Sequence, residues 1–165
     1  MSDSSSMIIA LATDHGGFAL KEQLKPWLSQ FGTVKDFGAA TLDPADDYPD
    51  FGIPAARFVA EDVDHRRGVL ICGSGNGMAV VANKLPGLRA IVVGHAYEFA
   101  NDESAPILAL PGKFVSVDEA KLIIQAWWNS LNQPLADRHQ RRIRKISQLE
   151  AKIRNSNIET RNKSE

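Results

Sequence analysis

A glycine-rich segment is the first feature of this sequence that could do chemistry. The residues after Cys72 read Gly-Ser-Gly-Asn-Gly, between an apolar run that predicts a strand and a stretch that predicts a helix. Alternate glycines there let successive backbone N–H groups converge on one point, and the helix N-terminus adds to their positive potential. We expect this segment to bind an anion or a developing oxyanion. The simpler alternative is a tight turn, which needs fewer glycines.

Other glycine motifs fit this segment less well. A dinucleotide fingerprint requires glycine where Met78 stands, and a P-loop requires a Gly-Lys-Ser/Thr sequence that is missing. The spacing also differs from G-x-S-x-G, so Ser74 does not lie in a nucleophile elbow.

Cys72 is the only cysteine of the chain and ends the predicted strand directly before the glycines. The converging N–H groups would favour a thiolate at this position. The alternative is a small buried hydrophobic residue, which is the commoner role of a lone cysteine. Because Cys72 cannot form a disulfide within the chain, a reducing compartment is the simplest inference.

A second motif follows the first apolar run, which spans residues 7–13. Asp14-His15 precedes two glycines and offers a carboxylate and an imidazole that titrates near neutral pH, although such a turn can also do no more than cap a helix. Further along the chain, Arg138 and Arg142 have the i, i+4 spacing of one helix face and could clamp a phosphate. An exposed basic helix is the alternative for this pair.

The elements that must position these residues alternate along the chain. Predicted strands cover 7–13, 34–37, 68–72, 88–93 and 107–110, and predicted helices cover 20–31, 53–63, 78–84, 117–131 and about 136–152, with a loop at 39–50. This alternation predicts an α/β fold, a parallel sheet with helices on both faces, whose ligands bind at the carboxyl ends of the strands. We expect one domain over residues 7–154, with flexible tails at 1–6 and 155–165.

Composition excludes several classes of protein. The net charge of −1 argues against a nucleic-acid binder, although Arg138–Arg154 contains seven Lys or Arg and one acid. The apolar run Met7–Ala12 is too short for a membrane span or a signal peptide, and no basic residue precedes it. We therefore expect a cytoplasmic protein. The spacing of His15, Cys72 and the acids indicates no metal site.

Five motifs in one order resemble the ribose-5-phosphate isomerase B family, which includes the galactose-6-phosphate isomerase subunits. They are Thr-Asp-His-Gly-Gly-Phe at 13–18, Asp-Tyr-Pro-Asp at 47–50, Ile-Cys-Gly-Ser-Gly-Asn-Gly-Met at 71–78, Ala-Asn-Lys-Leu-Pro-Gly-Leu-Arg-Ala at 82–90 and Asp-Arg-His-Gln-Arg-Arg at 137–142. The resemblance covers residues 7–146. It implies a three-layer, Rossmann-like sheet of five parallel strands and a homodimer or tetramer with active sites at the subunit interface. It implies no cofactor.

The same resemblance implies an aldose–ketose isomerase that acts on a sugar phosphate through a cis-enediolate. Cys72 would be the carbon base, because Met78 stands where some relatives carry a glutamate. Lys113 stands where relatives often have a phosphate-binding arginine and would reach a neighbouring subunit's site. The other implied roles are as follows: enediolate binding by Gly73, Gly75, Asn76 and Gly77, proton movement by Ser74, contacts to hydroxyls by Asp14 and Tyr48, and phosphate binding by His15, Arg138 and Arg142.

One departure from the family affects the expected substrate. Relatives carry a His-Asn pair before the fifth strand, and the histidine opens the sugar ring, whereas here the segment is shorter. Asn101 can match the asparagine, which puts Ala100 at the histidine, while another alignment puts Asp102 there and His95 could substitute. Ribose 5-phosphate is the expected substrate. A four-carbon sugar phosphate such as erythrulose 4-phosphate, a hexose phosphate such as galactose 6-phosphate, and a non-catalytic sugar-phosphate sensor are the alternatives.

Overall fold

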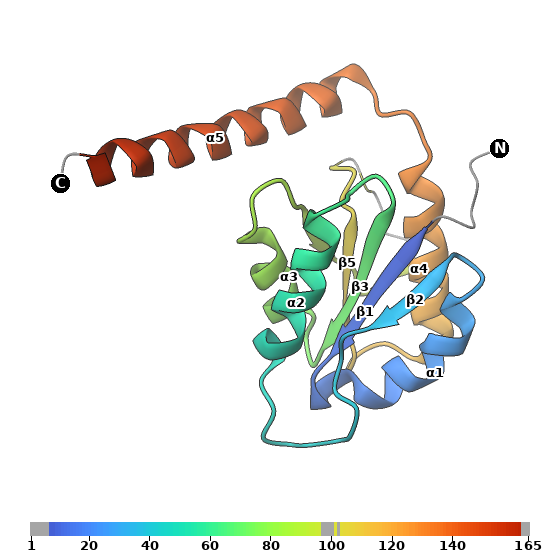
Figure 1. The fold of residues 1–165 in the computed structure, drawn as a ribbon. Helices are drawn as coiled ribbons and strands as arrows, with labels where there is room; N and C mark the ends of the chain where they lie inside the picture. Colours follow the sequence, from blue (N-terminus) through green and yellow to red (C-terminus); the bar gives the residue numbers. More distant parts are fainter. Residues whose placement is uncertain (1–6, 97–100, 102, 163–165) are drawn as a thin grey trace. The chain divides into compact units, whose positions relative to one another are not determined.

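Five strands form one parallel sheet in the computed structural model, which describes residues 7–96, 101 and 103–162. They are β1 (Ile8–Thr13), β2 (Thr33–Asp36), β3 (Arg66–Cys72), β4 (Ala90–Val92) and β5 (Ile107–Pro111). Their order in the sheet is β2-β1-β3-β5-β4, and every neighbouring pair is parallel (Figure 1). The predicted five-stranded parallel sheet is therefore confirmed.

In the part of the chain that the structure describes, four α-helices cover the two faces of the sheet. Helices α1 (Phe18–Leu28) and α4 (Val117–Leu131) lie on one face, and α2 (Tyr48–Ala60) and α3 (Asn76–Asn83) lie on the other (Figure 1). Successive strand residues point to opposite faces, so β1 sends Leu11 into the core under α1 and α4 and Ala12 into the core under α2 and α3. The three layers match the expected architecture.

Helix α2 begins earlier than the sequence predicts. Residues 39–50 are a predicted loop and the helix is predicted from residue 53, but α2 starts at Tyr48 and ends at Ala60. Pro49 lies in the first turn, where its missing N–H needs no partner, and therefore begins the helix instead of preventing it. As a result Tyr48 belongs to a helix and not to a loop.

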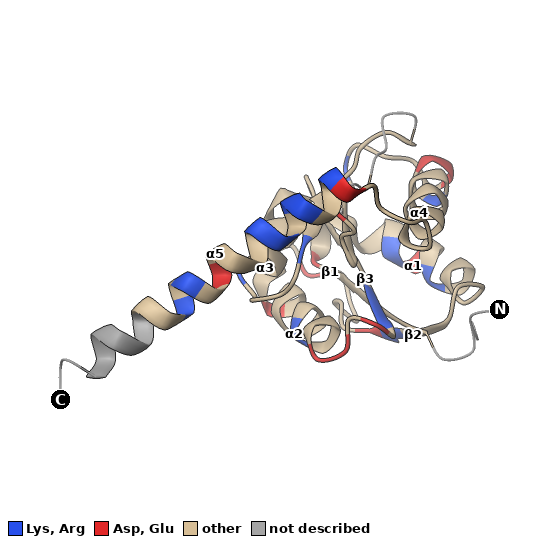
Figure 2. Cartoon of the chain, turned by 90° about the horizontal axis from the view of Figure 1, so that it is seen from above, with Lys and Arg blue, Asp and Glu red and all other residues tan. Residues whose placement is uncertain are grey.

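The structure divides the chain into two units, residues 1–133 and 134–165, and the sheet lies in the first. The second contains α5 (Asp137–Asn162), along which basic residues recur (Figure 2). The helix is longer than predicted, because the segment from residue 155, predicted to be a flexible tail, is helical as far as Asn162. A single domain over residues 7–154 stays a prediction. Among the helices of the described residues, none is both long and apolar enough to cross a membrane.

A buried lysine fixes the chain where β2 ends. The Lys21 ammonium, on α1, donates to Asp36 Oδ2 at 3.0 Å and to the Ala39 carbonyl at 2.8 Å. Burial disfavours the charged form of Asp36, but hydrogen bonds from Lys25, the Gly38 N–H and Lys21 outweigh it and lower the pKa of this carboxyl. These bonds fix the start of segment 37–47, which runs past the carboxyl ends of the strands to α2 (Figure 1).

We expect Gly17→Ala to lower the free energy of unfolding by about 1–3 kcal/mol, because overpacking forces neighbouring groups apart. A Cβ at Gly17 would overlap the Ile71 side chain and would lie 2.5 Å from Thr13 Oγ1. Urea denaturation measures the loss. Gly94→Ala is the control, since among the described residues its Cβ would meet only Pro111 Cγ, at 3.9 Å, and it should change stability by less than about 0.5 kcal/mol. Equal stability of the two variants would contradict the close packing.

Candidate active site

The turns that follow β1, β3 and β5 touch through their backbones. A Cβ at Gly16 would lie 2.7 Å from the Gly73 nitrogen, and a Cβ at Gly112 would lie 2.9 Å from the Gly17 Cα. Only glycine permits contacts this close. The two motifs singled out in the sequence therefore lie side by side at the carboxyl edge of the sheet, together with a third turn from β5.

The third turn brings Lys113 to the glycine loop, residues 73–77. The N–H of Gly112 donates to the Cys72 carbonyl at 2.8 Å, and the N–H of Lys113 donates to the Gly73 carbonyl at 3.1 Å, so the ladder between β3 and β5 continues past both strands. A Cβ at Gly73 would lie 3.3 Å from Lys113 Cε. Lys113 thus lies beside the glycine loop of its own chain, and its predicted reach into a neighbouring subunit stays a prediction.

The glycine loop opens directly into α3. Gly75 has a φ of 77°, in the left-handed region, and a Cβ on it would lie 3.0 Å from the Leu110 carbonyl carbon. The helix begins at the next residue, so its first N–H groups lie in the loop, where they have no partner within the helix. Ser74 and Asn76 are exposed on either side of Gly75. This is the arrangement expected of an anion site.

Cys72 is a free thiol at the base of the loop. Its side chain is 4% exposed and packs in the core beneath α2 and α3, with Ala12 and Met78. It therefore meets the description of a buried hydrophobic residue and also lies directly before the exposed glycine loop. The position of Cys72 is therefore compatible with both predicted roles, a buried hydrophobic residue and a thiolate beside the glycine loop.

Tyr48 closes the far end of the loop. A Cβ at Gly77 would lie 2.7 Å from the Tyr48 ring carbon Cζ, so the ring lies directly on this glycine. The early start of α2 is what brings the ring there, from the first position of the helix. Tyr48 is half-buried and lies beside the first turn of α3.

Asp14 and His15 are fixed by hydrogen bonds. Asp14 Oδ1 accepts from the Gly16 N–H at 2.9 Å and caps the 3₁₀ turn His15–Gly17. His15 Nδ1 lies 2.7 Å from Asp46 Oδ1, which also accepts the His15 backbone N–H at 2.9 Å. The side-chain hydrogen bond to Asp46 raises the pKa of His15, and the charge of Asp14 adds to the effect.

Asp46 is the residue that the sequence analysis missed. It lies 31 positions from His15, in a segment whose other acids give no sign of which one faces the site. Donor atoms of Asp14, His15 and Asp46 lie within 4.8 Å of one another, a closeness that the hydrogen bonds explain. We assign no metal to them.

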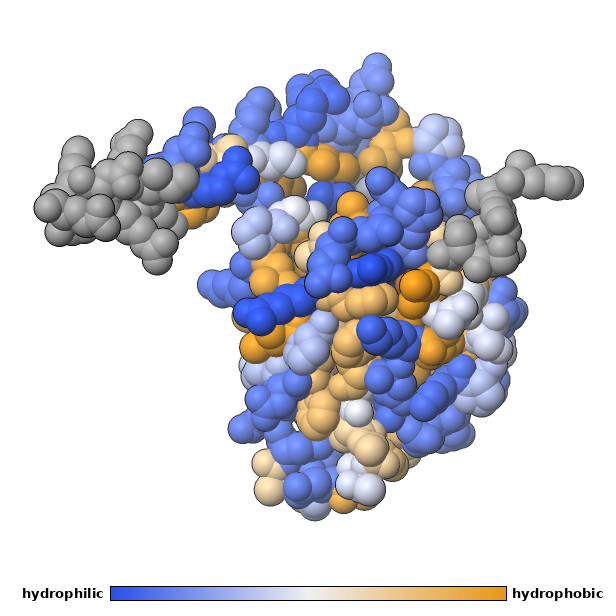
Figure 3. Space-filling model, in the orientation of Figure 1, coloured by the Kyte–Doolittle hydropathy of each residue, from blue (hydrophilic) through white to orange (hydrophobic). Residues whose placement is uncertain are grey.

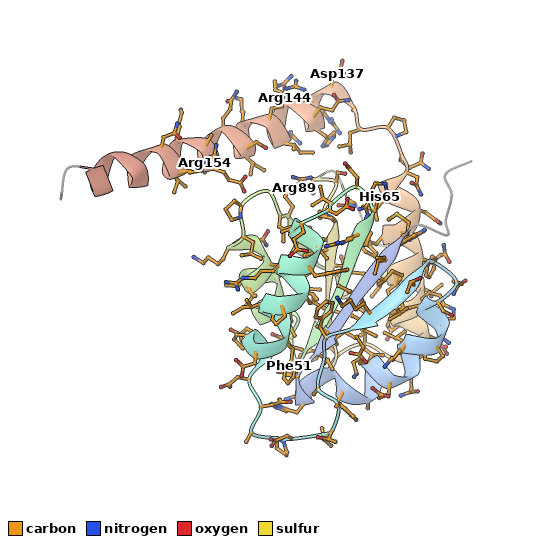
Figure 4. All side chains as sticks on the ribbon, viewed as in Figure 1. Phe51, His65, Arg89, Asp137, Arg144 and Arg154 are labelled. Atoms are coloured by element: carbon orange, nitrogen blue, oxygen red, sulfur yellow. The ribbon has the colours of Figure 1, made fainter. Side chains whose placement is uncertain are left out.

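Asn101 lies at the amino edge of the sheet, away from the glycine loop. Its Nδ2 donates to Ser130 Oγ at 3.1 Å, and its Oδ1 accepts from the Ala105 N–H at 2.8 Å, at the amino end of β5. In Figure 4, Arg89 and His65 mark this amino edge of the sheet. Phe51 of α2 lies toward the opposite, carboxyl edge. Both ends of the Asn101 amide are thus engaged away from Cys72, and its expected contact with substrate finds no support within its own chain.

Of the candidates for the missing histidine, His95 is the one that lies among the described residues. Ala100 and Asp102 lie outside the described residues. His95 is exposed, follows β4, and contributes to lowering the pKa of Glu119 after the larger effect of the hydrogen bonds from Ser116. Because Ser116 caps the N-terminus of α4, His95 lies toward the carboxyl edge.

Arg138 and Arg142 are both exposed on α5, with the predicted i, i+4 spacing. Arg138 Nε donates to His139 Nε2 at 2.7 Å. Since α5 belongs to the second unit, phosphate binding by this pair stays a prediction.

Comparison with known proteins places the chain in a family. The family model described as Ribose/Galactose Isomerase matches residues 9–146. Ribose-5-phosphate isomerase B of Mycolicibacterium paratuberculosis is 37% identical over 87% of this chain and 92% of its own length. The protein of the same name from Escherichia coli K12 is 36% identical over 86% of this chain and 95% of its own length.

Solved structures agree with the sequence relatives. The crystal structure of ribose-5-phosphate isomerase B from Mycoplasma genitalium with bound ribulose-5-phosphate matches with a TM-score of 0.78 at 33% identity, covering 89% of this chain and 98% of that one. The enzyme of Clostridium thermocellum matches with a TM-score of 0.78 at 36% identity, covering 89% and 99%. Because the family model matches residues 9–146 and relatives 37% and 33% identical match most of the chain, this chain belongs to the ribose/galactose isomerase family.

Proposed function

We propose that this protein is a ribose-5-phosphate isomerase, an enzyme that interconverts ribose 5-phosphate and ribulose 5-phosphate. The observation that carries the proposal is the backbone contact between the turns at Gly16 and Gly73, which brings Asp14 and His15 to the glycine loop after Cys72. Relatives that share most of the chain carry the name ribose-5-phosphate isomerase B, and one of them binds ribulose-5-phosphate.

The reaction needs a base for a carbon-bound proton and donors for the oxygens of an enediolate. The Cys72 thiolate removes the proton from C2 of the open-chain aldose, and the electron pair moves toward O1 to give the cis-enediolate. The N–H groups of the glycine loop stabilise the negative charge. Ser74 and Asp14 move a proton between O1 and O2, and the thiol returns a proton to C1 to give the ketose.

The phosphate lies at the other end of the substrate in this proposal. Two groups that can carry positive charge, His15 and Lys113, adjoin the glycine loop among the described residues: His15 precedes Gly16, which touches Gly73, and the Lys113 stem lies on Gly73. The family resemblance also assigns phosphate binding to Arg138 and Arg142 and a contact with a substrate hydroxyl to Tyr48. The chemistry requires neither a metal nor a cofactor.

We expect Cys72→Ala to lower kcat/KM for ribose 5-phosphate by about 10²–10⁴-fold, the usual contribution of a positioned base. Activity is measured on a panel of four-, five- and six-carbon aldose and ketose phosphates. Cys72→Ser is the second variant, since it keeps the size of the side chain and replaces the thiol by a much weaker acid. Circular dichroism checks that both variants are folded.

Each outcome of the panel has a distinct meaning. Turnover of ribose 5-phosphate that both variants lose supports the proposal. Turnover of a four-carbon or six-carbon substrate alone would reassign the substrate within the family. Binding of sugar phosphates with no turnover of any panel member would contradict an enzyme and favour a sensor.

We also propose that the protein is a homodimer or tetramer whose interface adjoins the active site. Ile146, Leu149 and Ile153 form an apolar stripe on α5 and are 42%, 58% and 54% exposed, so the described residues do not shield them from water. Hydrophobic residues also reach the surface of the unit up to residue 133 (orange in Figure 3). A groove of about 570 Å³ beside α3 and β4 begins at Asn76 of the glycine loop. A second copy is the occupant that the family resemblance favours.

We expect sedimentation equilibrium to show a dimer or a tetramer. Leu149→Asp should weaken self-association by at least about tenfold, because burying an unpaired carboxylate is costly. Ser147→Asp adds the same charge at an exposed position outside the stripe and should have little effect. A wild-type protein that stays monomeric at all concentrations would contradict the interface.

A cytoplasmic location completes the proposal. It is supported by a single cysteine, which cannot pair within the chain, and by a substrate class that belongs to central carbohydrate metabolism and the pentose phosphates.

A further inference from the structure

We propose that Asp46 is a positioning residue for phosphate recognition: it fixes the His15 ring and keeps Nε2 available as a hydrogen-bond donor to the phosphate of the substrate. The inference rests on the proposed sugar-phosphate function of the site. It assigns a role to a residue that lies outside all five sequence motifs.

The geometry of the pair determines which ring nitrogen is free. One carboxylate oxygen, Asp46 Oδ1, receives both the His15 backbone N–H at 2.9 Å and the ring nitrogen Nδ1 at 2.7 Å. Two bonds to one oxygen fix the main chain and the ring of His15 together. Since Nδ1 faces Asp46, Nε2 is the nitrogen left for a ligand, and the side chain is 35% exposed.

The burial of Asp46 favours the charged imidazolium. The Asp46 side chain is only 11% exposed, and its second oxygen, Oδ2, is buried with no hydrogen-bond partner among the described residues. A carboxylate in such surroundings needs a nearby positive charge. The imidazolium supplies it, and in that form both ring nitrogens are donors. A charged donor binds a phosphate oxygen more strongly than a neutral one.

Asp46 is itself held in place through its segment. At the start of segment 37–47, the Ala39 N–H donates to the Thr13 carbonyl at 3.0 Å, and Lys21 binds the Ala39 carbonyl. At the other end, the segment passes directly into α2. Segment 37–47, which carries Asp46, is therefore anchored near its start to β1 and α1 and is continuous with α2 at its end.

The charges around His15 come from three elements. Asp14 belongs to the same turn and Asp46 to segment 37–47, and both carboxylates favour the imidazolium. Lys113, on the turn after β5, lies against Gly73, which touches Gly16. Lys113 is exposed, and its positive charge is opposite in sign to the charges of Asp14 and Asp46. Because both carboxylates raise the pKa of His15, removal of the Asp46 charge should lower that pKa.

The first test compares Asp46→Asn with Asp43→Asn by calorimetry with ribose 5-phosphate near neutral pH. Asparagine keeps an acceptor at Oδ1 and removes the charge, so Asp46→Asn should weaken binding by about tenfold, raise KM to match, and change kcat by less than about twofold. Asp43 lies in the same segment. Its Oδ1 accepts a hydrogen bond from the Ala45 N–H, and an asparagine Oδ1 can accept the same bond. The Asp43→Asn variant should bind as the wild type does.

The pH profile separates positioning from a merely structural effect. In the wild type, KM should stay low until the pH passes the raised pKa of His15. In Asp46→Asn the rise should begin at lower pH, nearer the ordinary histidine value of about 6.5. The two proteins should then converge at low pH, where both imidazoles are charged. A profile of Asp46→Asn that coincides with the wild type overturns the proposal.

A double-mutant cycle with His15→Ala tests whether Asp46 acts through the imidazole. In the His15→Ala background, Asp46→Asn should have no further effect on binding. An undiminished tenfold effect there would mean that Asp46 acts in some other way, and it would overturn the proposal. Because binding is measured apart from turnover, a wild type that binds without turning over would contradict the isomerase function and leave this comparison intact.

Discussion

Three backbone turns touch at one edge of the sheet, and the rest of the site depends on that contact. Gly16 meets Gly73, and Gly112 meets Gly17, at separations that no side chain would permit. Parallel strands bring their carboxyl ends to one edge in any fold of this class, but they do not by themselves bring the turns into contact. The glycines do so, and they place a carboxylate, an imidazole and a lysine stem around the glycine loop.

The two faces of the sheet contribute differently to this edge. The face under α2 and α3 is lined by small residues such as Ala10 and Ala12, so these helices pack close to the strands. That closeness puts Cys72 in the core and the Tyr48 ring on Gly77. The other face carries the larger side chains and the buried Trp127, and it supplies the bulk of the core. One face thus shapes the site while the other mainly stabilises the sheet.

The sequence predicted what depends on neighbouring residues. Apolar runs predicted all five strands, and the glycine loop after Cys72 predicted the strand-to-helix turn, because both signals lie within a few residues. The start of α2 was missed since Pro49 reads equally well as a loop residue or as the first turn of a helix. The roles of Asp46 and Asn101 were beyond sequence reasoning, because each depends on a partner that only folding brings near: His15 for one, Ser130 and Ala105 for the other.

The most direct test of the account is exchange of the substrate's C2 proton with solvent. Ribose 5-phosphate is incubated with the wild type and with Cys72→Ala in deuterium oxide, and the C2 proton is followed by NMR. The account predicts that the wild type replaces this proton by deuterium and that the variant does not, although it still binds the sugar phosphate. Undiminished exchange of the C2 proton in the Cys72→Ala variant would contradict Cys72 as the carbon base.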